Sequence, residues 1–155
     1  MQSECDETSA TVRRRFEAAP SVVFAAFADP GLVERWLKPS PEVLLEVLAY
    51  DFAPSGHYRF AYTTPGEPLM HVSGTFALIE APSRIVFSWN IEPPDRHAGV
   101  SSEVRVSIAS IAGGAELTIQ HVNLSRLGAP RRHVDGWRGA LEGLAAFVAQ
   151  SPGPR

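Results

Sequence analysis

The sequence predicts an α+β domain in which a curved antiparallel sheet of about seven strands wraps around one long C-terminal helix, with two short helices after the first strand. Apolar and polar residues alternate in six successive segments between residues 43 and 124, with short turn signals between them, which indicates an antiparallel meander. Residues 131–150 show a helical apolar period instead. This helix, about 30 Å long at roughly 1.5 Å per residue, is the only predicted element long enough to cover the sheet.

The N-terminal part of the chain is predicted to form one strand and then two short helices. Residues 11–17 alternate between apolar and polar and suit a strand. Pro20 suits the first position of a helix, because the N–H that it lacks would have no helical partner there. Asp29 and Pro30 end this helix and begin a second over roughly residues 30–37, since Asp is a good N-cap and Pro a good first residue.

Six further strands follow before the final helix. Gly74 lies inside one of them, where it permits a bulge, a bend or close approach of another backbone. The predicted strands are residues 43–51, 56–64, 69–81, 84–91, 101–111 and 115–124. We expect a single domain over residues 11–150, between a flexible N-terminus, residues 1–10, and a flexible C-terminus, residues 151–155.

Composition excludes several classes of protein. The chain has 155 residues and a net charge of −3, which suits one globular domain and gives no case for a nucleic-acid partner. Its longest apolar runs, such as residues 22–28, are too short to span a membrane, and no secretory leader is visible. Cys5 is the only cysteine, which fits a reducing compartment. We therefore expect a cytoplasmic protein with no membrane partner.

No established catalytic or metal-binding signature is present. The sequence has no Gly-x-Ser-x-Gly elbow, no phosphate-binding loop and no His-Glu-x-x-His motif. Its five histidines are scattered, with no pair at the spacing of metal ligands. We assign no catalytic residue, no metal and no cofactor; the residues leave enzymatic activity undecided and favour its absence.

Several short motifs, in this order and spacing, resemble one known family. They are "RFEAAPSVVFAAFADPGLVERWLKP" at residues 15–39, "APSRIVFSW" at 81–89, "SSEVRVSI" at 101–108, "LTIQHVNL" at 117–124 and the pattern "GW--AL--LAAFV" at 136–148. Over about residues 11–149 the chain is similar to the activator of Hsp90 ATPase homologue 1-like proteins of the START/Bet v 1-like (SRPBCC) superfamily. One departure is Leu37, where many relatives have a second tryptophan.

The resemblance implies the helix-grip fold, with a hydrophobic cavity between the sheet and the long helix that commonly holds an apolar small molecule. It fixes no reaction. The family is named after a co-chaperone that carries this module beside a separate Hsp90-binding domain, so the name is weak evidence for a stress-response role here.

Strand parity and this resemblance together select the candidate ligand-binding side chains. His121 and Asn123 share the parity of apolar residues in their strand, so each is either a structural hydrogen-bonding group or a polar anchor for a ligand. The aromatic candidates are core residues first and cavity walls second. The full set is Trp36, Tyr58, Phe60, Tyr62, Met70, Phe76, Phe87, Trp89, His121, Asn123, Trp137 and Leu141.

The final helix contains three glycines, which cost about 1 kcal/mol each relative to Ala. This cost indicates a spatial requirement, either close contact with a neighbouring element or room for a ligand. His133 and Asp135 are not expected to form a catalytic set with Trp137, because positions two apart do not share a helix face. Trp137 is expected to form a wall of the cavity.

Three functions remain open from the sequence. The favoured one is a cytosolic binding module for an apolar or aromatic small molecule. The first alternative is an enzyme of the same superfamily, cyclase-, hydrolase- or dehydratase-like, that uses His121 in the cavity. The second is a stress- or chaperone-associated interaction protein. The sequence also leaves a homodimer open.

Overall fold

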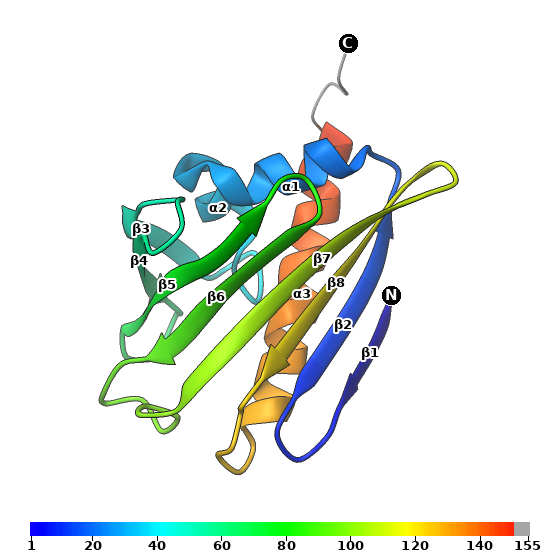
Figure 1. Ribbon diagram of the computed structural model, residues 1–155. Helices are drawn as coiled ribbons and strands as arrows, with labels where there is room; N and C mark the ends of the chain where they lie inside the picture. The colour runs from blue at the N-terminus through cyan, green and yellow to red at the C-terminus, as the bar shows by residue number, and fades with distance from the viewer. Residues whose placement is uncertain (151–155) are drawn as a thin grey trace.

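The computed structural model describes residues 1–150 and forms a curved antiparallel sheet around one long helix (Figure 1). The eight strands lie in the order β1-β2-β8-β7-β6-β5-β4-β3. The strands are β1 (Gln2–Cys5), β2 (Ala10–Phe16), β3 (Leu44–Tyr50), β4 (His57–Thr63), β5 (Met70–Glu80), β6 (Arg84–Ile91), β7 (Ser101–Ile111) and β8 (Gly114–Val122). The helices are α1 (Pro20–Ala28), α2 (Pro30–Trp36) and α3 (Ala129–Gln150).

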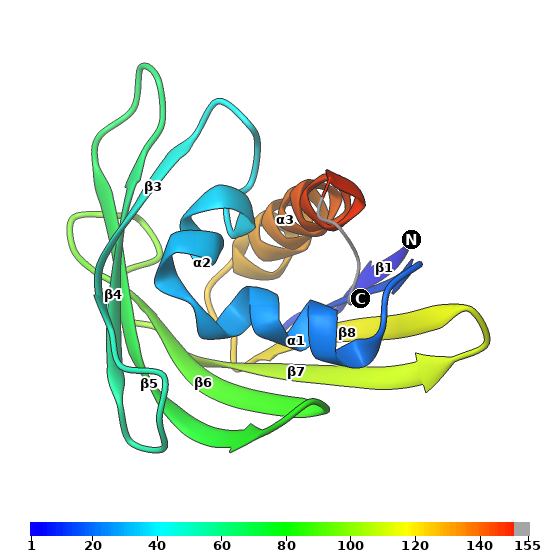
Figure 2. The same ribbon diagram turned by 90° about the horizontal axis from the view of Figure 1, so that it is seen from above.

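The helix-grip fold predicted from the sequence is confirmed. Helix α3 lies along the concave side of the sheet, while α1 and α2 cross one end of it (Figure 2). The predicted N-cap at Asp29 is also present, because its carboxylate accepts a hydrogen bond from the Gly31 N–H at 2.8 Å. The tail expected at residues 151–155 lies outside the described residues.

Strand β1 corrects the prediction of a flexible N-terminus and raises the number of strands from about seven to eight. Gln2–Cys5 pairs antiparallel with β2, in a register that places Ser3 opposite Val12. The hydroxyl of Ser3 also accepts a hydrogen bond from Arg138 of α3 at 2.6 Å. Neither face of β1 is buried, so no apolar alternation marks it in the sequence, and backbone pairing holds it in place.

Gly74 and the sheet bulges shape the concave face. A Cβ added at Gly74 would overlap the backbone oxygen of Ser88 and approach the Tyr58 ring within 2.7 Å, so this glycine permits close approach of the next strand. Register shifts lie between Val47 and Ala49 and between Phe76 and Leu78. Such irregularities bend a sheet, as is required for one that curves around a helix.

The glycines of α3 allow close contact with neighbouring backbone at some positions along the helix and leave open space at another. A Cβ at Gly139 would overlap the backbone oxygen of Pro39, and one at Gly143 would lie 3.4 Å from the backbone oxygen of Trp36. A Cβ at Gly136 would meet only the Pro39 Cβ, at 3.9 Å. The helix backbone therefore touches the α2–β3 connection at Gly139 and leaves room at Gly136. Within residues 1–150, no helix is long and apolar enough to cross a membrane.

Candidate functional site

A cavity of about 630 Å³ lies between the N-terminal half of α3 and the sheet, and is open to solvent on one side. Its walls come from α3, from the ends of β4, β5 and β6 with the loops after β4 and β6, and from the α2–β3 connection. The lining residues are Leu37–Ser40, Val43, Tyr62, Thr64, Glu67–Met70, Trp89, Ile91, Pro94–Arg96, Arg132, His133, Gly136, Trp137 and Ala140. Most of the buried wall is apolar or aromatic, and charged side chains lie toward the loops.

Two tryptophans dominate the aromatic wall. Trp89 of β6 and Trp137 of α3 have ring centroids 5.7 Å apart at an angle of 50°. The Trp137 indole N–H donates to Nδ1 of His121 at 3.1 Å. By contrast, Trp89 Nε1 is a buried donor that has no partner among residues 1–150. Buried polar groups are rarely left unpaired, so this N–H is an unsatisfied group at the edge of the cavity.

His121 lies behind the two tryptophans and is fully buried. The Ser102 hydroxyl donates to the Trp89 backbone oxygen at 2.7 Å, so its oxygen must accept from His121 Nε2 at 2.8 Å. Nδ1 of His121 accepts from Trp137, as the neutral Nε2–H tautomer requires. Burial, followed by the nearby His133, lowers the pKa of His121 well below its usual value. Both nitrogens are therefore occupied, and His121 has none free for a substrate.

His133 borders the cavity on the first turns of α3 and is also neutral near pH 7. Its Nδ1 lies 2.8 Å from the backbone oxygen of Ala129. Its ring centroid is 4.6 Å from that of His121 and 6.5 Å from that of Trp89. Burial lowers its pKa to about 4, and the charge of Arg132 adds to this effect. The side chain is thus a neutral imidazole at the cavity surface.

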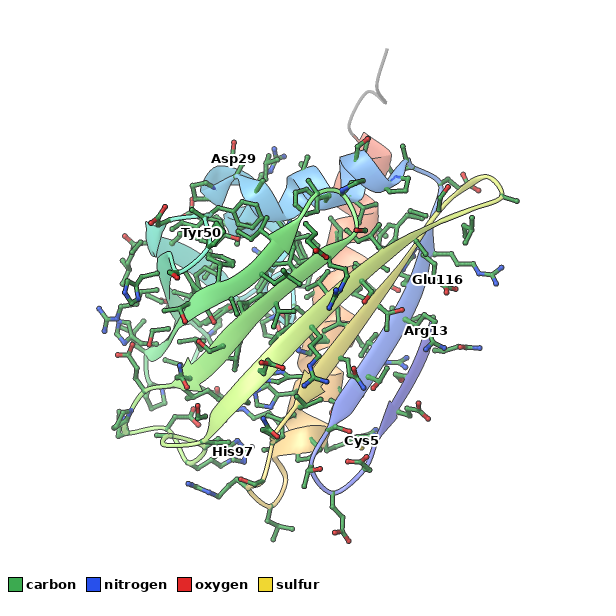
Figure 3. All side chains as sticks on the ribbon, in the orientation of Figure 1. Cys5, Arg13, Asp29, Tyr50, His97 and Glu116 are labelled. Carbon is green, nitrogen blue, oxygen red and sulfur yellow. The ribbon has the colours of Figure 1, made fainter. Side chains whose placement is uncertain are left out.

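An ion pair closes one side of the cavity. Arg132 binds Asp95 through two hydrogen bonds, Nη1–Oδ1 at 2.6 Å and Nη2–Oδ2 at 2.8 Å. The same guanidinium donates to Nδ1 of His97 at 2.8 Å and to the sulfur of Met70 at 3.1 Å. The Arg132 hydrogen bonds lower the pKa of Asp95 to about 2. Figure 3 shows His97 at the end of the molecule where α3 begins.

The structure brings four of the twelve predicted side chains to the cavity: Tyr62, Met70, Trp89 and Trp137. Seven others lie in the core away from the cavity surface. These are Trp36, Tyr58, Phe60, Phe76, Phe87, His121 and Leu141. Strand parity correctly placed the strand residues among them on the inner face, but parity does not say which inner residues a cavity reaches.

Asn123 corrects the prediction for the end of its strand. It is exposed, with φ of 63°, and β8 ends one residue before it, at Val122. The prediction assumed a strand as far as residue 124, whereas the alternation of the two faces ends with the strand at Val122. Asn is one of the few residues that adopt this left-handed conformation readily, so Asn123 turns the chain away from the sheet and does not enter the cavity.

Sequence reasoning missed His133 and Arg132 as cavity residues. His133, Gly136, Trp137 and Ala140 follow helical spacing on one face. Taken from Trp137, the same spacing would have identified His133 four residues earlier. Asp135 lies outside this face, as expected, and pairs with Arg131 at 3.6 Å on the surface. Among residues 1–150, no group of three or more His, Cys, Asp or Glu side chains is arranged to hold a metal ion.

Comparisons with known proteins agree with this architecture. A model of the family described as activator of Hsp90 ATPase homolog 1-like protein matches residues 17–149. None of the curated proteins matches the sequence. A solved structure from Chromobacterium violaceum is 21% identical, with a TM-score of 0.82 over 93% of this chain and 99% of that one. The AHSA1 protein of Silicibacter pomeroyi is 24% identical, with a TM-score of 0.80 over 91% and 97%.

Proposed function

The chain belongs to the activator of Hsp90 ATPase homolog 1-like family, and from its cavity we propose that it binds a small molecule with an apolar or aromatic body. The observation that carries the proposal is a cavity of about 630 Å³ walled by Trp89, Trp137, Tyr62 and Met70. Small-molecule sites typically measure about 300–1,000 Å³ and combine apolar walls with few polar groups. The exposed Cys5 supports a cytoplasmic location for this binding module, because free thiols are typical of reducing compartments.

The structure weakens the enzymatic alternative that used His121. For a histidine to act as general acid or base, one of its ring nitrogens must lie within hydrogen-bond reach of the substrate. Both nitrogens of His121 are instead bonded to Ser102 and Trp137, and its side chain is fully buried. The arrangement favours a structural role for His121, in which it fixes the orientation of the Trp137 wall.

Filling the cavity tests the binding function. Gly136→Leu places a side chain at the cavity surface, where an added Cβ meets only the Pro39 Cβ at 3.9 Å. Ala146→Leu adds the same side chain to an exposed position of the same helix and serves as the control. Titration calorimetry with naphthalene and 1-octanol should show binding to the wild type and to Ala146→Leu, and loss of at least about tenfold in affinity for Gly136→Leu, since the new side chain occupies the site of the probe. Absence of binding to the wild type, or equal binding to all three proteins, would refute the proposal.

A further inference from the structure

We propose that Nε2 of His133 is a fixed hydrogen-bond acceptor in the cavity, so that the preferred ligands are aromatic molecules carrying a hydroxyl or ring N–H. This inference rests on the proposed function, and it adds the chemical group by which a ligand is selected. It concerns a residue that lies beside the aromatic wall and takes part in neither the His121 network nor the Arg132–Asp95 ion pair.

The tautomer of His133 follows from its helix contact. Nδ1 lies 2.8 Å from the backbone oxygen of Ala129, and a carbonyl oxygen can only accept, so Nδ1 carries the hydrogen. Nε2 then has a lone pair and no hydrogen. Among residues 1–150, no donor reaches this nitrogen, and it is not among the fully buried unpaired atoms. The lone pair is therefore reachable from the cavity that His133 lines.

The charge state fits the same role. The side chain of His133 is more than nine-tenths buried, and burial lowers its pKa to about 4. The cationic Arg132 opposes protonation of His133 further, as would a proton on the neighbouring His97, while the Ala129 carbonyl and Asp95 favour it. At neutral pH the imidazole is thus uncharged, and an uncharged Nε2 without hydrogen accepts and does not donate.

Apart from the unpaired Trp89 indole N–H, which can only donate, the polar side chains deep in the cavity are already hydrogen-bonded. Both Nη atoms of Arg132 are bonded to Asp95, and it also contacts His97 and Met70. The Tyr62 hydroxyl donates to the Leu37 backbone oxygen at 2.9 Å. An acidic ligand group placed at Arg132 would have to displace Asp95, whereas a ligand donor can pair with His133 without breaking any bond.

The position of the ring favours an aromatic ligand. The Ala129 contact and the 4.6 Å packing against His121 hold the imidazole in one orientation. The Trp89 ring centroid lies 6.5 Å from that of His133, and the Trp137 ring lies 5.7 Å from that of Trp89, so an aromatic ligand bound at His133 meets aromatic walls with which it can pack. A group that is fixed before binding loses little entropy on binding, so a single hydrogen bond here contributes to selectivity.

Matched probes test the inference. Calorimetric titrations at neutral pH would compare 2-naphthol with 2-methoxynaphthalene, which has similar shape but no donor, and with naphthalene. The wild type should bind 2-naphthol about tenfold more tightly than 2-methoxynaphthalene, the usual effect of one buried hydrogen bond. His133→Phe should bind naphthalene and lose this preference. His57→Phe, at an exposed position on β4, should keep it.

A second measurement uses the wild type alone and does not depend on how His133→Phe folds. The ¹⁵N chemical shift of His133 Nε2 should move toward that of a hydrogen-bonded nitrogen with 2-naphthol and stay in place with 2-methoxynaphthalene. Equal affinity for these two probes, a preference that persists in His133→Phe, or an unchanged Nε2 shift would overturn the inference and leave the binding function standing. If none of the three probes binds, the inference and the proposed function fail together.

Discussion

Replacing Gly139 by Ala should destabilise the protein, although the same change is favourable in most helices. An added Cβ would overlap the backbone oxygen of Pro39 and lie 2.7 Å from its carbonyl carbon. These are backbone atoms, which cannot rotate away as a flexible side chain can. Either α3 or the α2–β3 connection must therefore shift, and the contact between them must be partly lost.

Gly136→Ala is the matched control, because it lies one turn earlier in the same helix. Its added Cβ would make an ordinary contact of 3.9 Å, so the change should stabilise the protein by about 1 kcal/mol through helix propensity. Gly139→Ala gains the same propensity but adds overpacking of about 2–3 kcal/mol, the upper part of the usual range, because the overlap is with backbone atoms, for a net loss of about 1–2 kcal/mol. The two variants should thus differ by about 2–3 kcal/mol.

Urea unfolding followed by circular dichroism measures this difference directly. In thermal unfolding, at about 2–4 °C per kcal/mol for a chain of this size, the melting temperatures of the two variants should differ by about 4–12 °C, with Gly139→Ala the lower. If Gly139→Ala is as stable as Gly136→Ala, the close approach of α3 to Pro39 is not a constraint and the argument is wrong.

Two other outcomes are expected. The contribution of His133 to the free energy of unfolding should fall by up to about 3 kcal/mol as the pH drops from 6.5 to about 4, because burial depresses its pKa in the folded state and the unfolded chain takes up the proton first. His121 adds a loss of the same sign, so pH-dependent urea titrations of His133→Phe should show a shallower slope than the wild type, not a flat one. Ser102→Ala should cost about 2–4 kcal/mol, since it leaves His121 Nε2 and the Trp89 backbone oxygen without their buried partner, and a loss under about 0.5 kcal/mol in denaturant unfolding would count against the network.

The sequence was sufficient to predict the strands and the helix that bury one face. Strands β2 to β8 and helix α3 place apolar residues toward a shared core, and their periods of two and 3.6 follow from that burial. Strand β1 buries no face and is held by hydrogen bonds to β2. Backbone pairing depends on which segment lies alongside, and this leaves no periodic trace in the paired residues.

The candidate site was only partly predictable, because a cavity forms where the side chains of neighbouring elements leave space unfilled. Tyr58 and Tyr62 have the same parity on β4, and both are buried. Tyr58 lies within a cluster of aromatic rings, and its ring centroid is 4.7 Å from that of Phe60 and 5.6 Å from that of Phe76. Tyr62, by contrast, lies at the end of the strand that borders the cavity. The difference arises from the curvature of the sheet and the placement of α3, which are tertiary features.

The cavity owes part of its volume to the way in which α3 packs at its glycines. Because Gly139 has no side chain, the backbone of α3 can touch the α2–β3 connection there. One turn earlier, at Gly136, the lack of a side chain leaves open volume. One turn before that, the side chain of His133 borders the cavity. Close contact and open space are thus two consequences of one sequence feature. A change that shifts α3 at Gly139, such as Gly139→Ala, should therefore also alter the cavity, because Pro39, the residue that Gly139 contacts, is part of the cavity wall.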